Sequence, residues 1–296
     1  MSIKTVGVIG LGSIGAVHAK NLKSLGCDVI VHDPKLPETR DSEYVLGNSD
    51  ALVISSPSND HAFQILVAPA GKPLFVEKPI GVSGSDVIEI EAVLRHKKNP
   101  IMVGFNLRFH SCVKKAKEWM DAGLIGKPLW ANFTCAQFND KPAYMRDGVI
   151  LNWSHEIDLA LYLLGSGSVS CSSTRLSNGR DDLTDILLTH KNGCRTHIHL
   201  DYLTKDELRG FTIVGTTGSI NINLLNGGVG CLNRDSGGSI GDSLYTPNNS
   251  WNENYIDEMK AWLDCIDGKE TIGATGEEGM ETLRICLEVR KQAGLE

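Results

Sequence analysis

The chain has 296 residues, of which 41% are hydrophobic and 22% charged, a balance typical of globular proteins that excludes extensive disorder. Its formal net charge of −7 argues against a nucleic-acid-binding protein, because phosphate binding requires concentrated Lys and Arg. No segment is long and apolar enough to cross a bilayer, and residues 6–9 lead directly into a glycine-rich turn instead of forming a signal peptide. We therefore expect a cytoplasmic protein without a nucleic-acid or membrane partner.

Eight cysteines are scattered along the chain without a Cys-x-x-Cys pair, and no cluster of histidines accompanies them. This distribution predicts neither a metal site nor a disulfide framework. The cysteines are expected to act as small buried hydrophobic side chains in a reducing compartment.

The N-terminal part of the chain alternates short apolar runs with helical patterns. Strands are predicted at residues 6–9, 29–32, 51–55, 74–76 and 101–105, and helices at 16–25 and 85–98. This alternation predicts an α/β Rossmann domain, whose sheet is mostly parallel and doubly wound with right-handed crossovers.

After Gly123 the pattern becomes that of an α+β domain with a large, mainly antiparallel open sheet. Strands are predicted at 129–137, 169–175, 182–190, 194–202, 211–214 and 219–223, with a helix at 154–164. Residues 226–249 are rich in Gly, Ser and Asn and are predicted to form a loop, and helices at 254–266 and 277–292 close the chain. The boundary is expected within 121–128, which gives domains at 1–123 and 124–296.

The last helix carries its own start signal. Thr275 and Glu278 have the spacing of a capping box, and Met280, Leu283 and Leu287 fall on one helical face.

A glycine motif follows the first predicted strand. Gly10, Gly12 and Gly15 stand in the pattern GxGxxG, with Ser13 and Ile14 at the start of the helix. The first glycine permits a tight turn, the second lets the backbone approach a pyrophosphate, and the third allows close packing of the helix. The pattern alone is weak evidence, but its place between a strand and a helix predicts a dinucleotide-binding turn.

An acidic residue ends the second predicted strand. Asp33 follows Gly15 at close to the spacing of about 20 residues expected for a ribose-binding acid. Its carboxylate would accept hydrogen bonds from the adenosine hydroxyls and repel a 2′-phosphate, which favours NAD over NADP. The alternative is a loop acid beside Pro34 without a ligand.

A lysine follows the strand at 74–76, within Glu77-Lys78-Pro79. It lies at the carboxyl edge of the predicted sheet, where ligands of open α/β sheets bind. There its ammonium could stabilise an alkoxide that forms as hydride leaves carbon. The alternative is an ordinary solvated lysine.

The chain resembles the glucose–fructose oxidoreductase and inositol dehydrogenase (Gfo/Idh/MocA) family along nearly its whole length. The resemblance is carried by motifs in both predicted domains: the glycine turn, Ser56-Pro57 with His61, Glu77-Lys78-Pro79, Asn106-x-Arg108, Gly148 with His155-Glu156-Ile157-Asp158, and Gly215-Thr216-Thr217-Gly218. The Glu-Lys-Pro element together with the later His-x-x-Asp helix is specific, whereas either one alone is not.

The resemblance implies an NAD-binding domain at 1–123 and a substrate-binding and oligomerisation domain at 124–296. Besides the glycine turn and Asp33, it implies cofactor-binding roles for Ser56, Pro57, His61, Glu77, Lys78 and Asn106. It also implies a homodimer or homotetramer that forms through the sheet of the second domain.

The implied catalytic residues are Lys78, His155 and Asp158, of which the last two share a helix face. His155 alone could be a core or capping histidine. Many relatives place an Asp just before this histidine, but here Asn152 is the nearest match. Asn can bind a hydroxyl but cannot take its proton, so the proton transfer would rest on His155, Lys78 or water. Further candidates for substrate contact, each of which could instead be a surface or interface residue, are Arg108, Tyr144, Arg146, Tyr202 and Arg209.

The predicted function is hydride transfer between NAD and a secondary hydroxyl of a sugar or a nucleotide sugar. The alternatives are a dehydrogenase or reductase for a small non-sugar compound, a non-catalytic sensor that binds NAD and sugar, and an enzyme weakened by Asn152. The pairing of Lys78 with His155 argues against the sensor, because binding alone does not require it.

Overall fold

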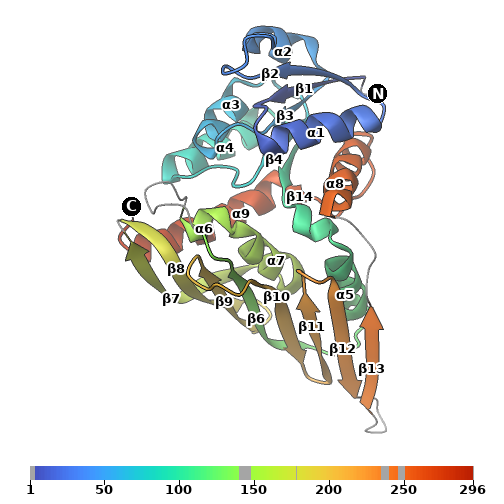
Figure 1. Ribbon diagram of the computed structural model, residues 1–296, viewed down its shortest axis with the longest axis vertical. Helices are drawn as coiled ribbons and strands as arrows, with labels where there is room; N and C mark the ends of the chain where they lie inside the picture. The colour runs from blue at the N-terminus through green and yellow to red at the C-terminus, as the bar shows by residue number, and fades with distance from the viewer. Residues whose placement is uncertain (1–3, 140–147, 178, 235–239, 246–250, 296) are drawn as a thin grey trace. The chain divides into compact units, whose positions relative to one another are not determined.

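The computed structural model describes residues 4–139, 148–177, 179–234, 240–245 and 251–295 (Figure 1). The chain divides into two compact units. Unit 1 comprises residues 1–109 and 250–284, and unit 2 comprises residues 110–249 and 285–296. This division differs from the predicted one at 123, because residues 250–284 return to the N-terminal unit.

Unit 1 contains the parallel sheet predicted from the sequence. Its strands are β1 (Thr5–Ile9), β2 (Asp28–His32), β3 (Ala51–Ile54), β4 (Leu74–Glu77), β5 (Ile101–Gly104) and β14 (Ala274–Thr275). Their order is β14-β5-β4-β3-β1-β2, and all neighbours are parallel except β14, which pairs antiparallel with β5. Strand β2 lies on one side of β1 and strand β3 on the other, so the strand order reverses direction between β1 and β3.

Unit 1 also contains helices that accompany this sheet. They are α1 (Ser13–Ser24), α2 (Ser42–Asn48), α3 (His61–Val67), α4 (Gly84–His96), α8 (Trp251–Ile266) and the start of α9 (Gly276–Gln292), with the short 3₁₀ helices η1 (Ser58–Asp60) and η2 (Asn106–Phe109).

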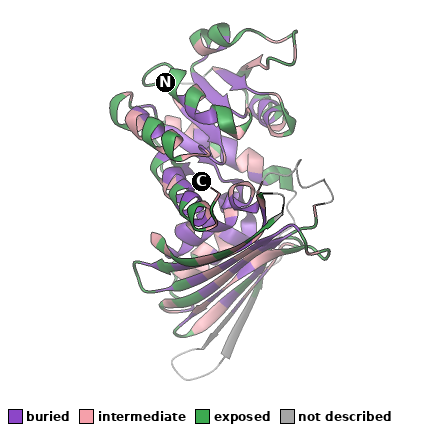
Figure 2. Cartoon of the chain, turned by 90° about the vertical axis from the view of Figure 1, so that its left-hand side faces the viewer, coloured by how far each residue is buried: buried purple, intermediate pink, exposed green. Residues whose placement is uncertain are grey.

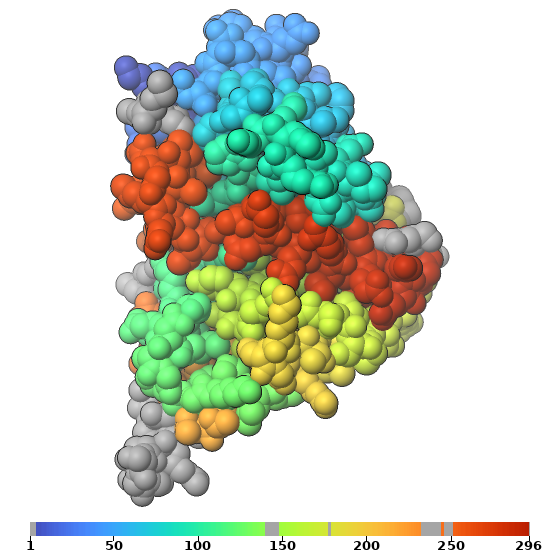
Figure 3. Space-filling model, turned by 180° about the vertical axis from the view of Figure 1, so that it is seen from behind, coloured from blue at the N-terminus to red at the C-terminus, as the bar shows by residue number. Residues whose placement is uncertain are grey.

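Helix α8 returns to unit 1 because of two apolar side chains. Met259 and Trp262, at helical spacing, are at most 1% exposed and belong to one core cluster with Val6 and Val8 of β1. Helix α8 also packs against α1, and Figure 3 shows the orange return segment against the blue and cyan elements of the same unit. The two helices therefore cover the same face of the parallel sheet.

Unit 2 is built on the large sheet. Its strands are β6 (Pro128–Ala136), β7 (Gly167–Ser177), β8 (Arg180–His190), β9 (Arg195–Asp201), β10 (Leu208–Gly215), β11 (Gly218–Asn223), β12 (Gly228–Arg234) and β13 (Ile240–Tyr245). The order is β13-β12-β11-β10-β6-β9-β8-β7. All pairs are antiparallel except β6 with β9, so the predicted mainly antiparallel sheet is confirmed.

The large sheet buries one of its faces. Alternate residues such as Phe133, Ile198 and Phe211 are at most 3% exposed, and the residues between them are more exposed (Figure 2). The buried face packs against α5 (Ser111–Asp121), α6 (Val149–Asn152) and α7 (Ser154–Leu164). Because one face of the sheet is buried and the other is exposed to solvent, apolar and polar residues alternate along its strands, as the sequence pattern indicates.

The prediction of a loop at 226–249 is wrong, because strands β12 and β13 occupy much of it. Gly228 and Gly230 alternate with buried Val229 and Cys231, so the strand has the right period but glycines on its outer face. Glycine carries no side chain that could mark a strand, and it is a common turn residue.

The capping box of α9 is confirmed. The Thr275 amide donates to Glu278 Oε2 at 2.9 Å, and the Glu278 amide donates to Thr275 Oγ1 at 3.2 Å. None of the helices in the described ranges is long and apolar enough to span a membrane.

Candidate functional site

The glycine turn leaves β1 as the motif predicts, and each glycine has a separate steric reason. Gly10 has a φ of 91°, and a Cβ there would lie 2.6 Å from the backbone nitrogen of Ser56. A Cβ on Gly15 would lie 2.0 Å from the Gly10 carbonyl oxygen, so the helix packs directly on the turn. A Cβ on Gly12 would meet nothing within 4 Å. Gly12 is therefore not required for packing, and its missing side chain leaves open space beside the helix start.

The start of α1 is suited to an anion. Gly12 is the N-cap residue and provides no side-chain cap, and the first turn, which begins with Ser13 and Ile14, has no acidic residue. The first amides of a helix have no partner within the helix and carry a partial positive charge. Open space beside Gly12 and uncapped amides together fit the pyrophosphate of a dinucleotide.

Asp33 follows β2 and binds the glycine turn. Its Oδ2 accepts from the Leu11 amide at 2.8 Å, and its Oδ1 accepts from the Lys35 amide at 2.9 Å. These backbone hydrogen bonds, that of Leu11 first, hold the pKa of the Asp33 carboxyl below its usual value. Asp33 is therefore an ionised acceptor at the place where a ribose-binding acid is expected.

The other predicted residues of unit 1 follow the same sheet edge. Ile9 pairs with His32 and Ile54, and Glu77 pairs with Gly104, so the carboxyl ends of neighbouring strands lie in register. Ser56 and Pro57 come after β3, Lys78 after β4, and Asn106, which is 4% exposed, after β5. The sheet thus brings the predicted cofactor residues of this unit to one edge.

His61 lies between two of these loops. It is 1% exposed, its Nδ1 is 2.8 Å from the Pro79 carbonyl oxygen, and its Nε2 is 3.0 Å from the Ser56 carbonyl oxygen. Both ring nitrogens are thus engaged by backbone, and His61 ties the loop after β3 to the loop after β4.

The Glu-Lys-Pro turn has a partner that the sequence analysis missed. His18 of α1 is 0% exposed, and its Nε2 is 2.6 Å from Glu77 Oε1. Lys78 is half-buried, and its amide donates to Glu77 Oε2 at 3.2 Å. No sequence signal links His18 to a carboxylate 59 residues away.

Arg108 is buried in unit 1 and forms an ion pair. Its side chain is 3% exposed, and its Nη1 is 3.3 Å from Glu278 Oε2. The arginine therefore connects η2 with the start of α9. Two other candidates for substrate contact, Tyr144 and Arg146, lie outside the described residues.

In unit 2, a buried aspartate fixes the segment that carries Asn152. Asp181 Oδ2 accepts from the Ile150 amide at 2.7 Å, and a Cβ on Gly148 would lie 1.9 Å from Asp181 Oδ1. Burial raises the pKa of Asp181. Only glycine at 148 lets the helix start approach this carboxyl so closely.

Asn152 ends α6 and is held by an aromatic pair. Its Nδ2 donates to the Tyr202 hydroxyl at 2.5 Å. Tyr202 is 2% exposed, and its ring lies edge-on to Trp153 with a centroid distance of 4.4 Å. Tyr202 thus orients the amide of Asn152.

His155 and Asp158 lie on α7, three residues apart as predicted. His155 is half-buried, whereas Asp158 is 1% exposed. Between them, Glu156 is 2% exposed, and its Oε1 accepts from Arg209 Nε at 2.8 Å. Arg209 therefore has an internal partner on the helix that carries His155.

His110 is a further buried histidine of unit 2, again missed in the sequence. Its Nδ1 accepts from the Cys112 amide at 3.2 Å and so caps α5. Burial first, and then the charges of Arg209 and Lys114, lower the pKa of His110 from 6.5 to about 4. The neutral ring is the form that can cap the helix, because only an unprotonated Nδ1 accepts a hydrogen bond.

His110→Asn is therefore expected to reduce the acid sensitivity of folding. Between about pH 6.5 and 4 the unfolded chain binds a proton at His110 that the folded chain does not, so the native protein loses stability as pH falls. Asn keeps a capping oxygen but does not titrate. Urea unfolding at pH 7 and pH 5 should show a smaller loss for the variant, and an equal loss would contradict this account.

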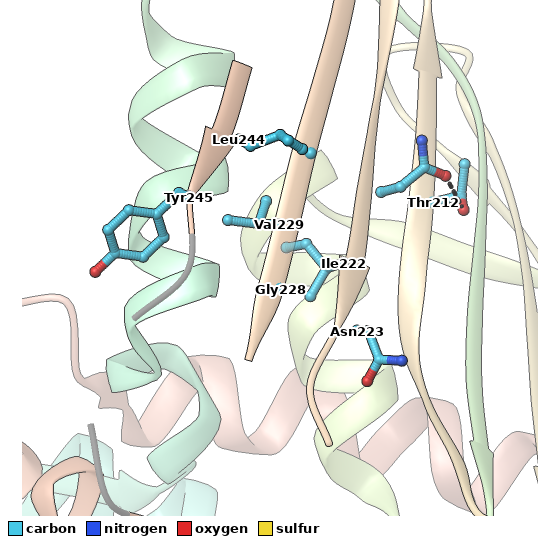
Figure 4. Close-up of a pocket in the computed structure, with 9 residues that line it drawn as sticks. Thr212, Ile222, Asn223, Gly228, Val229, Leu244 and Tyr245 are labelled. Atoms are coloured by element: carbon cyan, nitrogen blue, oxygen red, sulfur yellow. Dashed lines mark hydrogen bonds between the residues drawn. The ribbon is translucent and has the colours of Figure 1, made fainter. Parts of the chain in front are cut away.

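A shallow hollow of about 380 Å³ lies on the large sheet between β10 and β13 (Figure 4). Thr212 and Asn221, joined by a 2.8 Å hydrogen bond, line it together with Gly228, Gly230 and Leu244. None of the predicted site residues lines it, so it is a separate feature of the sheet surface.

Comparisons with known proteins agree with this architecture. A model of the GFO/IDH/MocA C-terminal domain matches residues 113–221, and a model of the NAD binding domain of D-isomer specific 2-hydroxyacid dehydrogenases matches residues 1–70. The chain is 26% identical to a myo-inositol 2-dehydrogenase of Thermotoga maritima over 97% of this chain and 95% of that protein.

Solved structures match over the whole chain. Levoglucosan dehydrogenase in complex with NADH has a TM-score of 0.88 at 19% identity, covering 98% of this chain and 97% of the other. UDP-N-acetylglucosamine 3-dehydrogenase of Acidithiobacillus ferrooxidans has a TM-score of 0.84 at 19% identity, with 100% of both chains covered. These neighbours share the fold of both units. The family model over residues 113–221 and the full-length similarity to an inositol dehydrogenase support the GFO/IDH/MocA resemblance seen in the sequence.

Proposed function

We propose that this protein is an NAD-dependent dehydrogenase that oxidises a secondary hydroxyl of a sugar or a nucleotide sugar. The observation that carries the proposal is the glycine turn, where the open space at Gly12 and the ionised Asp33 lie at the same sheet edge as Lys78. The curated relative named above acts on inositol, and the structural neighbours on levoglucosan and a nucleotide sugar.

The cofactor is NAD, which supplies a hydride acceptor when it is bound. The uncapped start of α1 would hold its pyrophosphate, and Asp33 would accept hydrogen bonds from its adenosine ribose. The cofactor-binding roles of Ser56, Pro57 and Asn106 rest on their places at the ends of β3 and β5.

Lys78 and His155 act on the same substrate hydroxyl in this proposal. The Lys78 ammonium stabilises the developing alkoxide, and the His155 imidazole takes part in moving the hydroxyl proton. Asn152, oriented by Tyr202, holds a neighbouring hydroxyl, and the buried Asp158, three residues after His155 on α7, orients a neighbouring group of the site.

Activity with NAD and a panel of sugars, nucleotide sugars and small non-sugar compounds, cyclic polyols among them, tests this function through NADH absorbance. We expect turnover with at least one sugar or nucleotide sugar. Binding of NAD and sugar without NADH formation would favour the sensor. Turnover only with small non-sugar compounds would favour the other enzyme class.

Asp33→Ser is expected to weaken NAD and to admit NADP. The change removes a charge that would repel a 2′-phosphate, so the ratio of kcat/KM for NAD over NADP should fall about tenfold or more. Steady-state kinetics with both cofactors measure it. If the unaltered protein uses NAD and NADP equally, the role given to Asp33 is wrong.

We also propose that a second copy of the chain packs on the exposed face of the large sheet. Trp130 is 43% exposed on this face, and Leu244 at the edge of the hollow is 81% exposed. A hydrogen-bonded row links Asn132, on the same strand as Trp130, with His197 and Asp185 on the next two strands. Light scattering of the purified protein should give the mass of a dimer or tetramer, and a monomer at all concentrations would refute this interface.

A further inference from the structure

His18 has a fixed position in the core of unit 1. It is 0% exposed, and its ring lies edge-on to Phe75 and Tyr255, with centroid distances of 5.2 and 6.0 Å. Among the described residues, the polar contact of its ring is the 2.6 Å approach of Nε2 to Glu77 Oε1. The two aromatic rings leave the imidazole little freedom to turn away from this carboxylate.

The carboxylate continues the connection to Lys78. Glu77 is 8% exposed, and its second oxygen, Oε2, accepts from the Lys78 amide at 3.2 Å. On the neighbouring strand, a Cβ on Gly104 would lie 3.1 Å from the Glu77 carboxyl carbon. The carboxyl group therefore rests directly on the β5 backbone and is held by α1 on one side and by the lysine amide on the other.

The hydrogen bonding of His18 defines its tautomer. Nδ1 of His18 is buried and has no hydrogen-bond partner among the described residues. A proton on Nδ1 would be a buried donor without an acceptor, which costs more than a bare lone pair facing apolar rings. The ring therefore carries its proton on Nε2 and donates it to Glu77.

We propose that His18 is a positioning residue for Lys78 that acts through Glu77. The His18 imidazole holds the Glu77 carboxylate in place, and the carboxylate holds the backbone amide of Lys78. The position of that amide sets where the Lys78 side chain begins. The same helix, α1, begins at the glycine turn, so one element sets both the pyrophosphate site and the lysine. This inference rests on the proposed function, in which Lys78 acts on the substrate.

Two amide variants separate positioning from packing. In His18→Gln the side-chain nitrogen can reach the place of Nε2, whereas in His18→Asn it reaches only the place of Nδ1, where no acceptor lies. Both lose the ring, so loss of aromatic packing is common to them. We expect kcat of the Asn variant to fall about 10- to 100-fold, because small displacements of a reacting group are costly. In the Gln variant, kcat should stay within about threefold of the unaltered protein's value.

The Michaelis constants for NAD and substrate should remain close to those of the unaltered protein in both variants, since neither removes a group that binds them. Lys78→Met is measured beside them. If Lys78→Met is inactive but the Gln and Asn variants have equal kcat, positioning by His18 is refuted and the function stands. If Lys78→Met remains active, the role of the lysine in the proposed function fails.

Should His18→Asn not fold, Glu77→Gln decides the question. The Glu77 carboxylate faces two donors, His18 Nε2–H and the Lys78 amide, whereas a Gln side chain has only one acceptor oxygen, so its amide nitrogen must face one of the two donors. A lower kcat with unchanged Michaelis constants supports the connection. A kcat equal to that of the unaltered protein overturns it.

Discussion

Lys78→Met is expected to lower kcat about a thousandfold or more, because removal of a group that stabilises charge or moves a proton in the transition state typically costs two to four orders of magnitude. Met keeps an unbranched apolar stem out to the position of Cε and removes the ammonium beyond it. Lys78 follows β4 and is half-buried, so this change leaves the strand and its register intact. NADH fluorescence titration should give a dissociation constant within about threefold of the unaltered protein, since the pyrophosphate and ribose sites lie on other loops.

Lys117→Met is the matched control. Lys117 forms a 2.5 Å pair with Asp121 on the surface of α5, and such exposed pairs contribute little. Its kcat should equal that of the unaltered protein. Unchanged turnover in Lys78→Met would remove the lysine from the chemistry, and loss of NADH binding in the same variant would show that it serves the cofactor instead.

The features that the sequence predicts well are those whose physics is local. The central strands of unit 1, β1, β3, β4 and β5, are buried on both faces and read as short apolar runs, as in Ala51–Ile54, where every residue is buried. The glycine turn is a steric requirement of a few neighbouring residues, so GxGxxG after a strand indicates it correctly. The capping box of Thr275 and Glu278 is likewise contained within one helical turn.

Features that depend on distant partners leave no such pattern. His18 reads as an ordinary residue of its helix until Glu77 is placed beside it, and Asp181 reads as the residue before a predicted strand until its hydrogen bond with the Ile150 amide is seen. Helix α8 has a plain amphipathic pattern, and nothing in it tells which sheet Met259 and Trp262 cover. The sequence therefore predicts the cofactor-binding edge of unit 1 better than it predicts the distant contacts, such as His18 with Glu77, that hold the site residues in place.

Gly12→Val offers the sharpest test of the cofactor site, because it should abolish NAD binding without disturbing the fold. Gly12 has a φ of −60° and a ψ of −173°, which any residue can adopt. A Cβ there meets nothing within 4 Å, so the valine projects into open space beside the start of α1. That space is where a pyrophosphate would approach the backbone, and the dissociation constant for NAD should rise about a hundredfold or more, or roughly 2.7 kcal/mol.

Gly15→Ala in the same turn is the contrasting variant. Its Cβ would lie 2.0 Å from the Gly10 carbonyl oxygen, so the helix must move away from the turn. Overpacking of this kind costs about 1–3 kcal/mol and should lower Tm by several degrees, whereas Gly12→Val, which only places a less favourable residue at the N-cap, should lower Tm less. Differential scanning calorimetry and NADH titration on both variants separate a steric requirement of the fold from a steric requirement of the ligand. A Gly12→Val protein that binds NAD as tightly as the unaltered chain would mean that the pyrophosphate does not approach this turn.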